Sequence, residues 1–389
     1  MEVAPSFYDA IIGECSRSGL HPVIIHSHPQ SHIAVYSPSD DYGETRLLRV
    51  LGDLLPGHTV GSLVVGENGS VTGRELTDAG FRPFESITIL GRRIRVIQPN
   101  GLSADTLGQE RFDRQILAFG PEGQSTLSRL RVGVVGLGGT GSIVAELLAR
   151  QGIGELVLVD ADNVDETNLS RLMCASDGDV GRSKVEVAAF SLRRAGHVHV
   201  TPLTDSVLKQ AVLSAISHCD LVFSCVDNDS ARAVLNRFSH QYYIPMVDMG
   251  VRLDARSGNV TACGARVSIV GVAATCLRCS HHLDPERIRA ESMSLQERSR
   301  LAKEGYVMGV AGPAPAVIAV NTLVAGLAVT SGINLFVNLT GSDSPTSQIF
   351  DGANGEVFTV TPSHNDGCGI CDPTSGVQGM GDACIVSAY

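Results

Sequence analysis

The central part of the chain alternates short apolar runs with longer segments of helical periodicity. The apolar runs predict strands at Arg131–Val135, Glu155–Val159, His197–Pro202, Asp220–Ser224 and Met246–Gly250. The segments between them predict helices at Ser142–Gln151, Ser183–Ala195, Val207–Ser217 and Ser230–His240. Strands that alternate with helices are typical of a mostly parallel sheet with helices on both faces. The pattern therefore predicts an α/β fold, a Rossmann-like doubly wound domain.

The first hundred residues follow a different pattern, in which short strands surround one predicted helix. An apolar run at Val23–Ile25 enters a histidine-rich turn, and a helix is predicted around Thr45–Leu55. Ser62–Val65 and Ser70–Gly73 predict a hairpin, and Ile87–Ile97 predicts a second pair of strands. This pattern predicts a smaller α+β domain.

Length and composition support two globular domains and exclude several classes of protein. The 389 residues are 43% hydrophobic and 18% charged, so the chain can bury a large core. The net charge of -11 argues against a surface for nucleic acid or for anionic lipid. We expect the smaller domain over 1–101, the larger over 102–375 and a tail over 376–389.

The chain ends and the apolar segments indicate a cytoplasmic protein without a membrane span. Met1–Tyr8 is short, acidic and interrupted by proline, unlike a secretory signal peptide. Gly305–Ser342 carries no charge, but its prolines and polar residues favour a buried or dimer helix over a membrane span. In a reducing compartment, pairs among the ten cysteines are more often metal ligands than disulfides.

A glycine-rich turn directly follows the first predicted strand of the larger domain. Gly136, Gly138 and Gly141 match the pattern G-x-G-x-x-G, with Gly139 inside it. Glycines there allow a tight turn and a close approach of the backbone to phosphate at a helix N-terminus. Asp160 ends the next predicted strand, where a ribose-binding acid belongs. Taken alone, the pattern fits NAD as well as ATP.

Charged residues outside this turn favour ATP over a dinucleotide. They are Arg111, Arg114, Arg171, Lys184 and Asp227. A site that splits ATP must neutralise charge on the α-phosphate and the departing pyrophosphate, which calls for Arg, Lys and an Asp that holds Mg²⁺. A nicotinamide site needs few positive charges, and no residue is placed for hydride chemistry. We therefore expect ATP and disfavour an oxidoreductase.

With these motifs, the chain from about Arg111 to Cys371 resembles the E1-like family of ThiF, MoeB and ubiquitin-activating adenylation domains. The resemblance implies that a carboxylate attacks the α-phosphate of ATP, which yields an acyl-adenylate and pyrophosphate. It also implies a homodimer, in which Arg114 or Arg111 reaches the partner's site. The implied ATP-binding residues are Gly136, Gly138, Gly139 and Gly141 for phosphate, Asp160 for ribose, Asp162, Asn168, Arg171 and Lys184 near the phosphates, and Asp227 for Mg²⁺.

Each of these residues also has a purely structural interpretation. Asp162 fits a solvated turn, Asn168 a turn, Lys184 a surface charge at a helix N-terminus, and Arg111 with Arg114 one exposed helix face. Their occurrence together, in the order of the family, favours the ATP site.

Two C-x-x-C pairs predict a metal site in the larger domain. They are Cys276 with Cys279 and Cys368 with Cys371. Each pair can place two thiolates around one tetrahedral metal. The resemblance to the E1-like family implies a structural Zn²⁺ at these four residues. The alternative is unpaired thiols or an oxidised pair.

The segment after the first C-x-x-C pair lacks a nucleophile that many relatives carry. Ser280–Val310 contains no cysteine, and Leu301 stands where the family has the cysteine that captures the acyl group as a thioester. Leucine is no nucleophile. Either the enzyme stops at the adenylate and passes it to an external nucleophile, or Cys174, Cys263 or Cys384 takes the role.

A histidine pair in the smaller domain predicts a second metal site. His26 and His28 are two positions apart on a predicted strand, so they share a face and can bind one Zn²⁺. Asp40, at the start of the next helix, can supply a third ligand and leave a position for water, while Ser37 can stabilise an oxyanion. This H-x-H-P…S-x-x-D run resembles the core of JAMM/JAB metalloproteases over Pro22–Arg95. The resemblance implies cleavage of bonds at ubiquitin-like C-termini.

Two features leave the activity of this smaller domain open. The family's general-base Glu lies on a strand upstream of the histidines, whereas Glu2 and Glu14 lie in no predicted strand. Either the natural chain begins earlier, or this is a shortened domain without its base, used to dock a partner. Ser37 with Pro38 also fits a helix N-cap without a catalytic role.

Together these motifs predict an adenylyltransferase that uses ATP and Mg²⁺ to activate the C-terminal carboxylate of a ubiquitin-like protein or peptide. One alternative is adenylation of a short ribosomal peptide in natural-product biosynthesis, which the missing loop cysteine favours. An alternative of another class is a non-catalytic scaffold that binds a ubiquitin-like protein, against which the intact Arg, Lys and Asp set argues. No nucleic-acid or membrane partner is expected.

Overall fold

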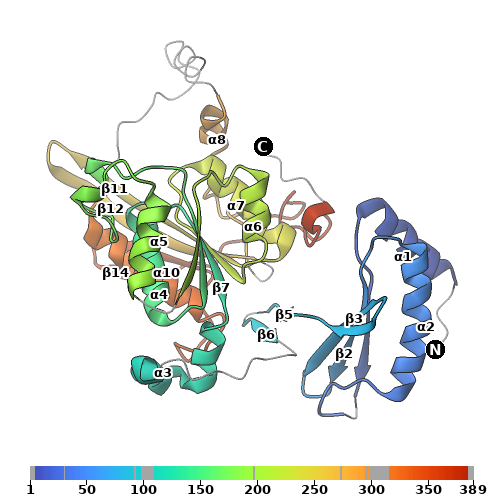
Figure 1. Ribbon diagram of the computed structural model, residues 1–389. Helices are drawn as coiled ribbons and strands as arrows, with labels where there is room; N and C mark the ends of the chain where they lie inside the picture. Colours follow the sequence, from blue (N-terminus) through green and yellow to red (C-terminus); the bar gives the residue numbers. More distant parts are fainter. Residues whose placement is uncertain are drawn as a thin grey trace. The chain divides into compact units, whose positions relative to one another are not determined.

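The computed structural model describes residues 5–29, 31–91, 93–97, 109–195, 198–271, 274–293, 297 and 315–383. The chain divides into two compact units (Figure 1). The smaller unit contains residues 1–90 and 94–107, and the larger contains residues 91–93 and 108–389.

The smaller unit is a four-stranded sheet with its helices α1 and α2. Its elements are α1 Pro5–Ser18, β1 Val23–His28, α2 Pro38–Leu54, β2 Val60–Gly66, β3 Val71–Thr77, β4 Gly80–Pro83, β5 Ile87–Ile89 and β6 Arg95–Ile97. The sheet order is β1-β2-β3-β4, with β1 parallel to β2 and the other pairs antiparallel. β5 and β6 form a separate two-stranded ribbon. The predicted hairpin and the second strand pair are confirmed, whereas α1 was not predicted.

Helix α2 begins seven residues earlier than the prediction around Thr45–Leu55. Ser37 is its N-cap: the Ser37 side chain accepts from the Asp40 N–H, and the Asp40 carboxylate accepts from the Ser37 N–H. Pro38 follows at the first helical position, where its fixed φ suits a helix. The first turns are polar, so the hydrophobic periodicity begins late, where Leu48 and Leu51 pack against Val60.

The larger unit is built on an eight-stranded mixed sheet. Its strands are β7 Arg131–Val135, β8 Glu155–Val159, β9 His199–Leu203, β10 Leu221–Ser224, β11 Met246–Arg256, β12 Asn259–Val270, β13 Ser347–Asp351 and β14 Glu356–Thr359. The order is β14-β13-β12-β11-β10-β7-β8-β9, in which β7 to β11 run parallel and β12 to β14 are antiparallel. The predicted doubly wound sheet is confirmed, with an antiparallel extension that was not predicted.

Helices cover both faces of this sheet (Figure 1). They are α3 Gln109–Leu127, α4 Gly139–Gln151, α5 Lys184–Ala195, α6 Gln210–Ile216, α7 Asp229–Tyr242, α8 Pro285–Glu291 and α10 Ile318–Ile333, with short 3₁₀ helices η1 Glu166–Asn168, η2 Asp177–Asp179 and η3 Gly381–Ala383. α4, α5 and α10 lie on one side of the sheet, and α6 and α7 lie on the other. Buried apolar residues of β7, β8, β10, α6 and α7 form one continuous core cluster.

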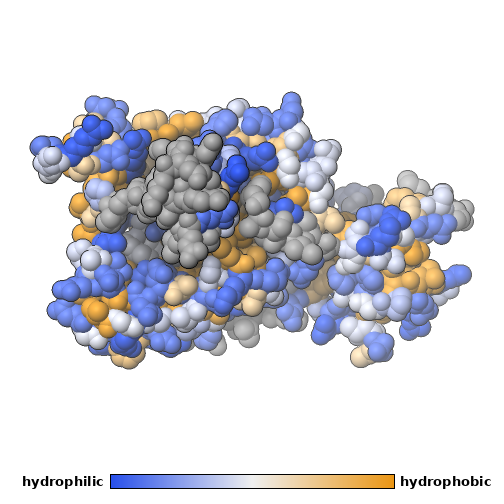
Figure 2. Space-filling model, turned by 90° about the horizontal axis from the view of Figure 1, so that it is seen from above, coloured by the Kyte–Doolittle hydropathy of each residue, from blue (hydrophilic) through white to orange (hydrophobic). Residues whose placement is uncertain are grey.

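The charge-free stretch contains a buried helix, as its sequence indicates. α10 has 16 residues and packs on α4, β11 and β12, with Val324, Ala325 and Ala328 fully buried. The part of the stretch before residue 315 lies outside the described residues. No helix among the described residues is long and apolar enough to cross a bilayer. The face shown in Figure 2 is largely hydrophilic, with its hydrophobic side chains in separate patches.

Candidate functional site

Three loops meet at one edge of the large sheet because they follow neighbouring strands. Val135, the last residue of β7, pairs with Val159 of β8 on one side and with Ser224 of β10 on the other. The glycine-rich turn, Asp160 and the loop of Asp227 therefore leave the sheet at the same level. The strand order reverses at β7, and in open α/β sheets such a switch point is where ligands bind.

The glycine-rich turn is packed too tightly for side chains at three of its positions, Gly136, Gly139 and Gly141. Gly136 has a φ of 89°, which favours glycine, and its N–H donates to Val159 O. A Cβ on Gly141 would overlap the Gly136 carbonyl, and a Cβ on Gly139 would overlap Asn321. Gly138, the N-cap of α4, has no atom within 4 Å of where its Cβ would stand. The turn thus presents open space and backbone at the N-terminus of α4, a site suited to phosphate.

Asp160 ties the glycine-rich turn to the loop that follows β8. The Leu137 N–H donates to Asp160 Oδ2 (2.6 Å), and the Asp162 N–H donates to Oδ1 (2.8 Å). Burial raises the pKa of Asp160, although these two hydrogen bonds and Lys184 act in the opposite direction. Lys184 Nζ lies 4.0 Å from Asp160 Oδ1 and 2.8 Å from Asp162 Oδ2. The predicted Asp160, Asp162 and Lys184 therefore form one cluster.

Asn168 and Arg171 lie beside the turn, in and after the 3₁₀ helix η1. The Arg171 chain packs against Gly139, whose Cβ would stand 3.0 Å from Arg171 Cδ. Arg171 also donates to Thr167 O (2.7 Å), and Asn168 Nδ2 lies 3.5 Å from Thr167 Oγ1. The structure thus brings Arg171 to the glycine-rich turn, and the Arg171 N–H donates to Asn168 O (2.9 Å) in the same loop.

The remaining predicted residues of this site are exposed. Asp227 lies in the loop between β10 and α7, directly before Asn228, whose side chain caps α7 by accepting from the Ala231 N–H. Arg111 and Arg114 lie on α3 with exposed side chains, as the structural interpretation of one helix face has it. Within the single chain, their reach toward a partner's site stays a prediction.

A buried ionic network lies behind the loop of Asp227, and sequence analysis did not identify it. Asp248 of β11 is fully buried and contacts Ser224 Oγ (2.7 Å), Arg232 Nε (3.1 Å) and Arg266 (2.7 Å). Arg232 also donates to Val226 O (2.8 Å), next to Asp227. Arg232, Asp248 and Arg266 lie on three separate elements, α7, β11 and β12, so no local sequence pattern indicates that they meet.

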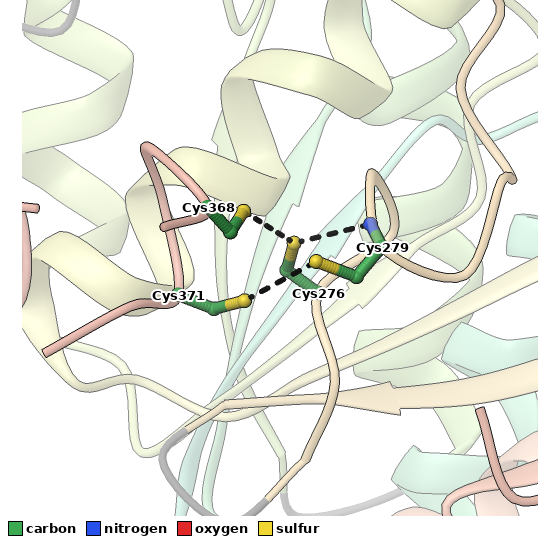
Figure 3. A group of neighbouring side chains, drawn as sticks. All are labelled: Cys276, Cys279, Cys368 and Cys371. Atoms are coloured by element: carbon green, nitrogen blue, oxygen red, sulfur yellow. Dashed lines mark hydrogen bonds between the residues drawn. The ribbon is translucent and has the colours of Figure 1, made fainter. Parts of the chain in front are cut away.

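The four cysteines of the two C-x-x-C pairs converge, as predicted (Figure 3). Their sulfur atoms all lie within 4.8 Å of one another, with Cys276 to Cys368 at 3.8 Å and Cys279 to Cys371 at 3.6 Å. All four side chains are buried, and none forms a disulfide. Four converging thiols in a buried position fit a tetrahedral metal ion such as Zn²⁺.

The candidates for a thioester cysteine differ in their surroundings. Burial raises the pKa of Cys174 to about 11, which disfavours the thiolate that a nucleophile needs. Cys263 lies on β12, where its sulfur packs against Gly352. Leu301 and Cys384 lie outside the described residues.

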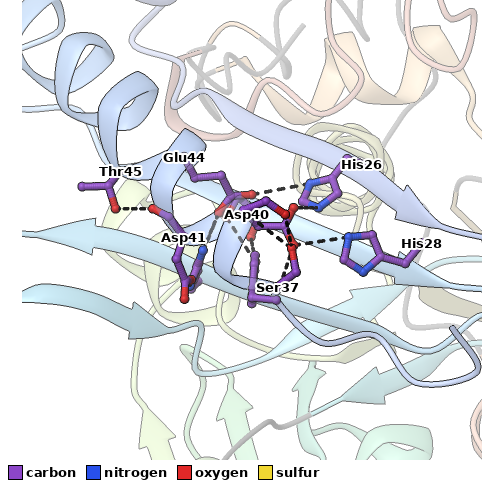
Figure 4. Close-up of polar contacts among 11 residues, drawn as sticks. His26, His28, Ser37, Asp40, Asp41, Glu44 and Thr45 are labelled. Atoms are coloured by element: carbon purple, nitrogen blue, oxygen red, sulfur yellow. Dashed lines mark hydrogen bonds and ion pairs between the residues drawn. The ribbon is translucent and has the colours of Figure 1, made fainter. Parts of the chain in front are cut away.

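The second predicted metal group also assembles, in the smaller unit (Figure 4). His26 and His28 lie on one face of β1, and Asp40 lies in the first turn of α2. Asp40 Oδ1 and Oδ2 are each 3.3 Å from a histidine, His26 Nε2 and His28 Nε2 respectively. One ligand atom from each residue lies within 4.8 Å of the others, and His26 Nε2 is buried without a hydrogen-bond partner among the described residues. This donor set fits a metal ion such as Zn²⁺.

Ser37 is engaged with Asp40, as the N-cap interpretation has it. The Ser37 N–H and Oγ donate to Asp40 Oδ2 at 2.6 and 2.7 Å. Burial alone would raise the pKa of Asp40, but these bonds and the two histidines lower it below its ordinary value. Glu14 lies on α1, where its carboxylate accepts from Arg17 and Ser18.

Glu44 is a further residue of this group that sequence analysis missed. Its Oε1 lies 3.5 Å from His26 Nδ1, and its side chain is buried. A signal was present in the sequence, because Glu44 follows Asp40 by four residues, and side chains four apart share a helix face.

Comparisons with known proteins found a matching family model and several relatives. The ThiF family model matches residues 112–370 and does not reach the smaller unit. Molybdopterin-synthase adenylyltransferase of Salmonella typhimurium is 37% identical over 177 residues, which are 44% of this chain and 68% of that protein. The SAMP-activating enzyme E1 of Haloferax volcanii is 40% identical over 149 residues, 38% of this chain and 55% of that protein. The chain thus spans between about half and two thirds of these relatives.

A solved structure supports the fold independently. The crystal structure of E. coli MccB with ATP has a TM-score of 0.53 and 20% sequence identity, and the likeness covers 71% of this chain and 76% of that one. At this identity the likeness is one of fold.

Proposed function

The chain belongs to the ThiF family of E1-like enzymes, and we propose that it activates the C-terminal carboxylate of a ubiquitin-like protein or peptide with ATP and Mg²⁺. One observation carries the proposal: the glycine-rich turn, Asp160 and the loop of Asp227 follow three neighbouring strands at the switch point of the sheet. Lys184 and Arg171 supply positive charge at the same edge. A phosphate-binding turn with acids and cations around it fits ATP better than a dinucleotide.

Each residue has a proposed role in this reaction. The backbone of Gly136, Gly138, Gly139 and Gly141 would bind phosphate, and Asp160 would bind the ribose while it holds the turn through the Leu137 N–H. Asn168, Arg171 and Lys184 would contact the phosphates, with Asp162 orienting Lys184. Asp227 would hold Mg²⁺, which supplies charge neutralisation at the phosphates when bound.

The proposed chemistry is a displacement at phosphorus. A carboxylate oxygen of the substrate attacks the α-phosphorus of ATP, and the bond to the oxygen that bridges to the β-phosphate breaks. The products are an acyl-adenylate and pyrophosphate. Negative charge grows on the pyrophosphate as it leaves, so Lys184 and an arginine of the site would stabilise the transition state more than the ground state.

Pyrophosphate release tests this function. The wild-type chain is incubated with Mg-ATP and candidate ubiquitin-like proteins or peptides that end in a free carboxylate. We expect Asp227→Ala and Lys184→Met to abolish release without loss of the fold, whereas Asp254→Ala, an exposed acid of β11, leaves it unchanged. Full activity of Asp227→Ala would refute the Mg²⁺ role, and no release with any partner would favour the scaffold.

Adenylation of a short ribosomal peptide is the second candidate for the substrate. The observation in its favour is the absence of a cysteine from Ser280–Val310, so no thioester in this segment would follow the adenylate. Mass spectrometry of the products separates the candidates, because an adenylated peptide and an adenylated ubiquitin-like protein differ in mass.

For the smaller unit we propose a JAMM/JAB-like domain with Zn²⁺ held by His26, His28 and Asp40. The convergence of the three ligand atoms within 4.8 Å supports it. Zn²⁺ with an open position would polarise a substrate carbonyl when bound. Zinc content of the wild-type chain and of His28→Ala tests the site, with one equivalent fewer expected in the variant. Equal zinc content in both would refute it.

We further propose that Cys276, Cys279, Cys368 and Cys371 hold a structural Zn²⁺. All four positions of the tetrahedron would be filled by sulfur, so the metal would have no position for substrate. We also propose a homodimer in which Arg114 or Arg111 completes the partner's site. Exposed apolar side chains on α10 and β14, among them Ile318, Leu323, Val357 and Phe358, support an interface there. Light scattering at several concentrations tests the dimer.

A further inference from the structure

We propose that Glu44 is a positioning residue that fixes the tautomer of His26, so that His26 Nε2 faces the metal site of the smaller unit. The inference rests on the proposed Zn²⁺ at His26, His28 and Asp40. It assigns a positioning role to a buried glutamate of α2.

The two ring nitrogens of His26 face two different carboxylates (Figure 4). Nε2 lies 3.3 Å from Asp40 Oδ1, on the side of the metal group. Nδ1 lies 3.5 Å from Glu44 Oε1, on the opposite side. A neutral imidazole carries one N–H, and the nitrogen without it is the metal ligand. The carboxylate that holds the N–H therefore decides which nitrogen is free for a metal.

Glu44 is held rigidly in place by residues of the sheet. Its Oε2 accepts from Ser62 Oγ (2.7 Å) and from Arg74 (2.7 Å). Arg74 in turn lies between the rings of Tyr36 and Phe81, at 3.5 and 3.7 Å from their centroids. Arg74, placed against both rings and paired with Glu44 Oε2, thus holds one side of the carboxylate in place, while Oε1 is turned toward His26.

The other carboxylate oxygen of Glu44, Oε1, faces His26. Glu44 is 7% exposed, and its Oε1 has no hydrogen-bond partner in the described part of the chain. A buried carboxylate oxygen without a partner is costly, so an N–H at His26 Nδ1 would satisfy it. The buried, unpartnered Nε2 then carries the lone pair. Both orphaned atoms are satisfied when Nδ1 carries the proton and Nε2 binds the metal.

Carboxylates that accept from a metal-binding histidine orient the ring and raise its basicity. Their loss costs about 10–100-fold in metal affinity. Asp40 is oriented in a comparable way by the Ser37 N–H and Oγ. Two of the three proposed ligands are thus held by neighbours before any metal binds.

The tautomer of His26 tests the inference without any metal. The full chain, labelled with ¹⁵N-histidine and stripped of metal, is studied by long-range ¹H–¹⁵N NMR at pH 8, with His26→Gln for assignment. We expect the proton of His26 on Nδ1 in the wild type. A proton on Nε2 would overturn the proposal, whatever the metal content of the chain.

Metal affinity gives the second test, with a matched pair of variants. Glu44→Gln removes the charge behind His26, whereas Asp41→Asn removes the other partner of Arg74, a side chain that is 57% exposed. Co²⁺ is titrated into the metal-free full chain, because a nitrogen and oxygen site lacks the strong thiolate absorption of a four-cysteine site. We expect Glu44→Gln to weaken the nitrogen and oxygen site about 10–100-fold and Asp41→Asn to leave it within about 3-fold.

The outcomes separate the two proposals. Wild-type chain that binds no Co²⁺ at the nitrogen and oxygen site refutes the metal proposal, while the NMR result still decides the tautomer. Tight binding by both wild type and Glu44→Gln refutes the role of Glu44 alone. The melting temperature of each metal-free variant shows whether it is folded, and the wild-type NMR measurement decides the question if Glu44→Gln is not.

Discussion

The glycine-rich turn allows a sharp prediction for the substitution Gly141→Ala. The new Cβ would stand 2.9 Å from the Gly136 carbonyl carbon, closer still to its oxygen, and 3.1 Å from Cys225 Cβ. Optimal contacts between heavy atoms are about 3.5–4.0 Å, so the turn has to move by about 1 Å. That movement disrupts the 2.6 Å bond from the Leu137 N–H to Asp160. A hydrogen bond to a charged group is worth about 1.5–3 kcal/mol.

Loss of this hydrogen bond in Gly141→Ala should lower both the stability of the larger unit and the rate of adenylation. For a unit of this size, about 2 kcal/mol lowers the melting temperature by roughly 5 °C. A displacement of about 1 Å in groups that position a substrate costs about 100-fold in rate. Scanning calorimetry and ATP–pyrophosphate exchange, with the activated substrate present, measure the two effects.

Gly138→Ala is the matched control in the same turn. Gly138 has a φ of -73°, which alanine adopts freely, and its Cβ would meet no atom within 4 Å. We expect an unchanged melting temperature and a KM for ATP raised about 10-fold, since the Cβ would keep phosphate from the backbone. Gly141→Ala with wild-type stability and exchange would refute the packing argument. Equal destabilisation by both variants would show that the space at Gly138 is not open.

Three further predictions follow from buried groups. Asp248→Asn leaves Arg232 and Arg266 without their shared carboxylate and should lower the free energy of unfolding, measured with urea, by about 3–5 kcal/mol. Asp254→Asn, on the exposed end of β11, is the control and should lower it by less than about 0.5 kcal/mol. Burial, with a smaller effect of His364, lowers the pKa of His240 from 6.5 to about 4. Between these pH values the unfolded chain binds more protons than the folded chain, so the contribution of His240 to stability is complete above pH 6.5 and is lost as the pH falls toward 4. His240→Leu should therefore remove about 3 kcal/mol of the loss in unfolding free energy between pH 6.5 and 4, as measured by calorimetry. Cys368→Ser, or a chelator on the wild type, should lower the melting temperature of the larger unit, and the chelator should have no further effect on that transition in the variant.

The alternation of strands and helices in the larger unit was readable because each parallel strand is short and apolar. β7, β8 and β10 are buried on both faces, so nearly every residue in them is hydrophobic. The antiparallel strands β12 to β14 escaped prediction because they are partly exposed and mix polar with apolar residues. Local pattern carries little information about a strand whose partner determines its register.

Motif spacing located the cysteine group and the histidine group for a similar reason. His26 and His28 lie on one strand, and each C-x-x-C pair lies within one turn, so local geometry already brings two ligands together. Asp248, Arg232 and Arg266 come from separate elements and meet only in the folded sheet. Their proximity depends on tertiary packing, which no local pattern encodes.

The four-cysteine group also changes how the chain is connected. Cys276 and Cys368 are 92 residues apart, and they enclose α8, α10, β13 and β14. A metal at this group would close the intervening chain into a ring, and closure of a ring of that size removes about 4–5 kcal/mol of entropy from the unfolded state. A protease that cuts once between Cys279 and Cys368 would therefore yield two pieces that stay joined, and a chelator would be needed to separate them. The integrity of this part of the molecule would then depend on coordination bonds as much as on its peptide bonds.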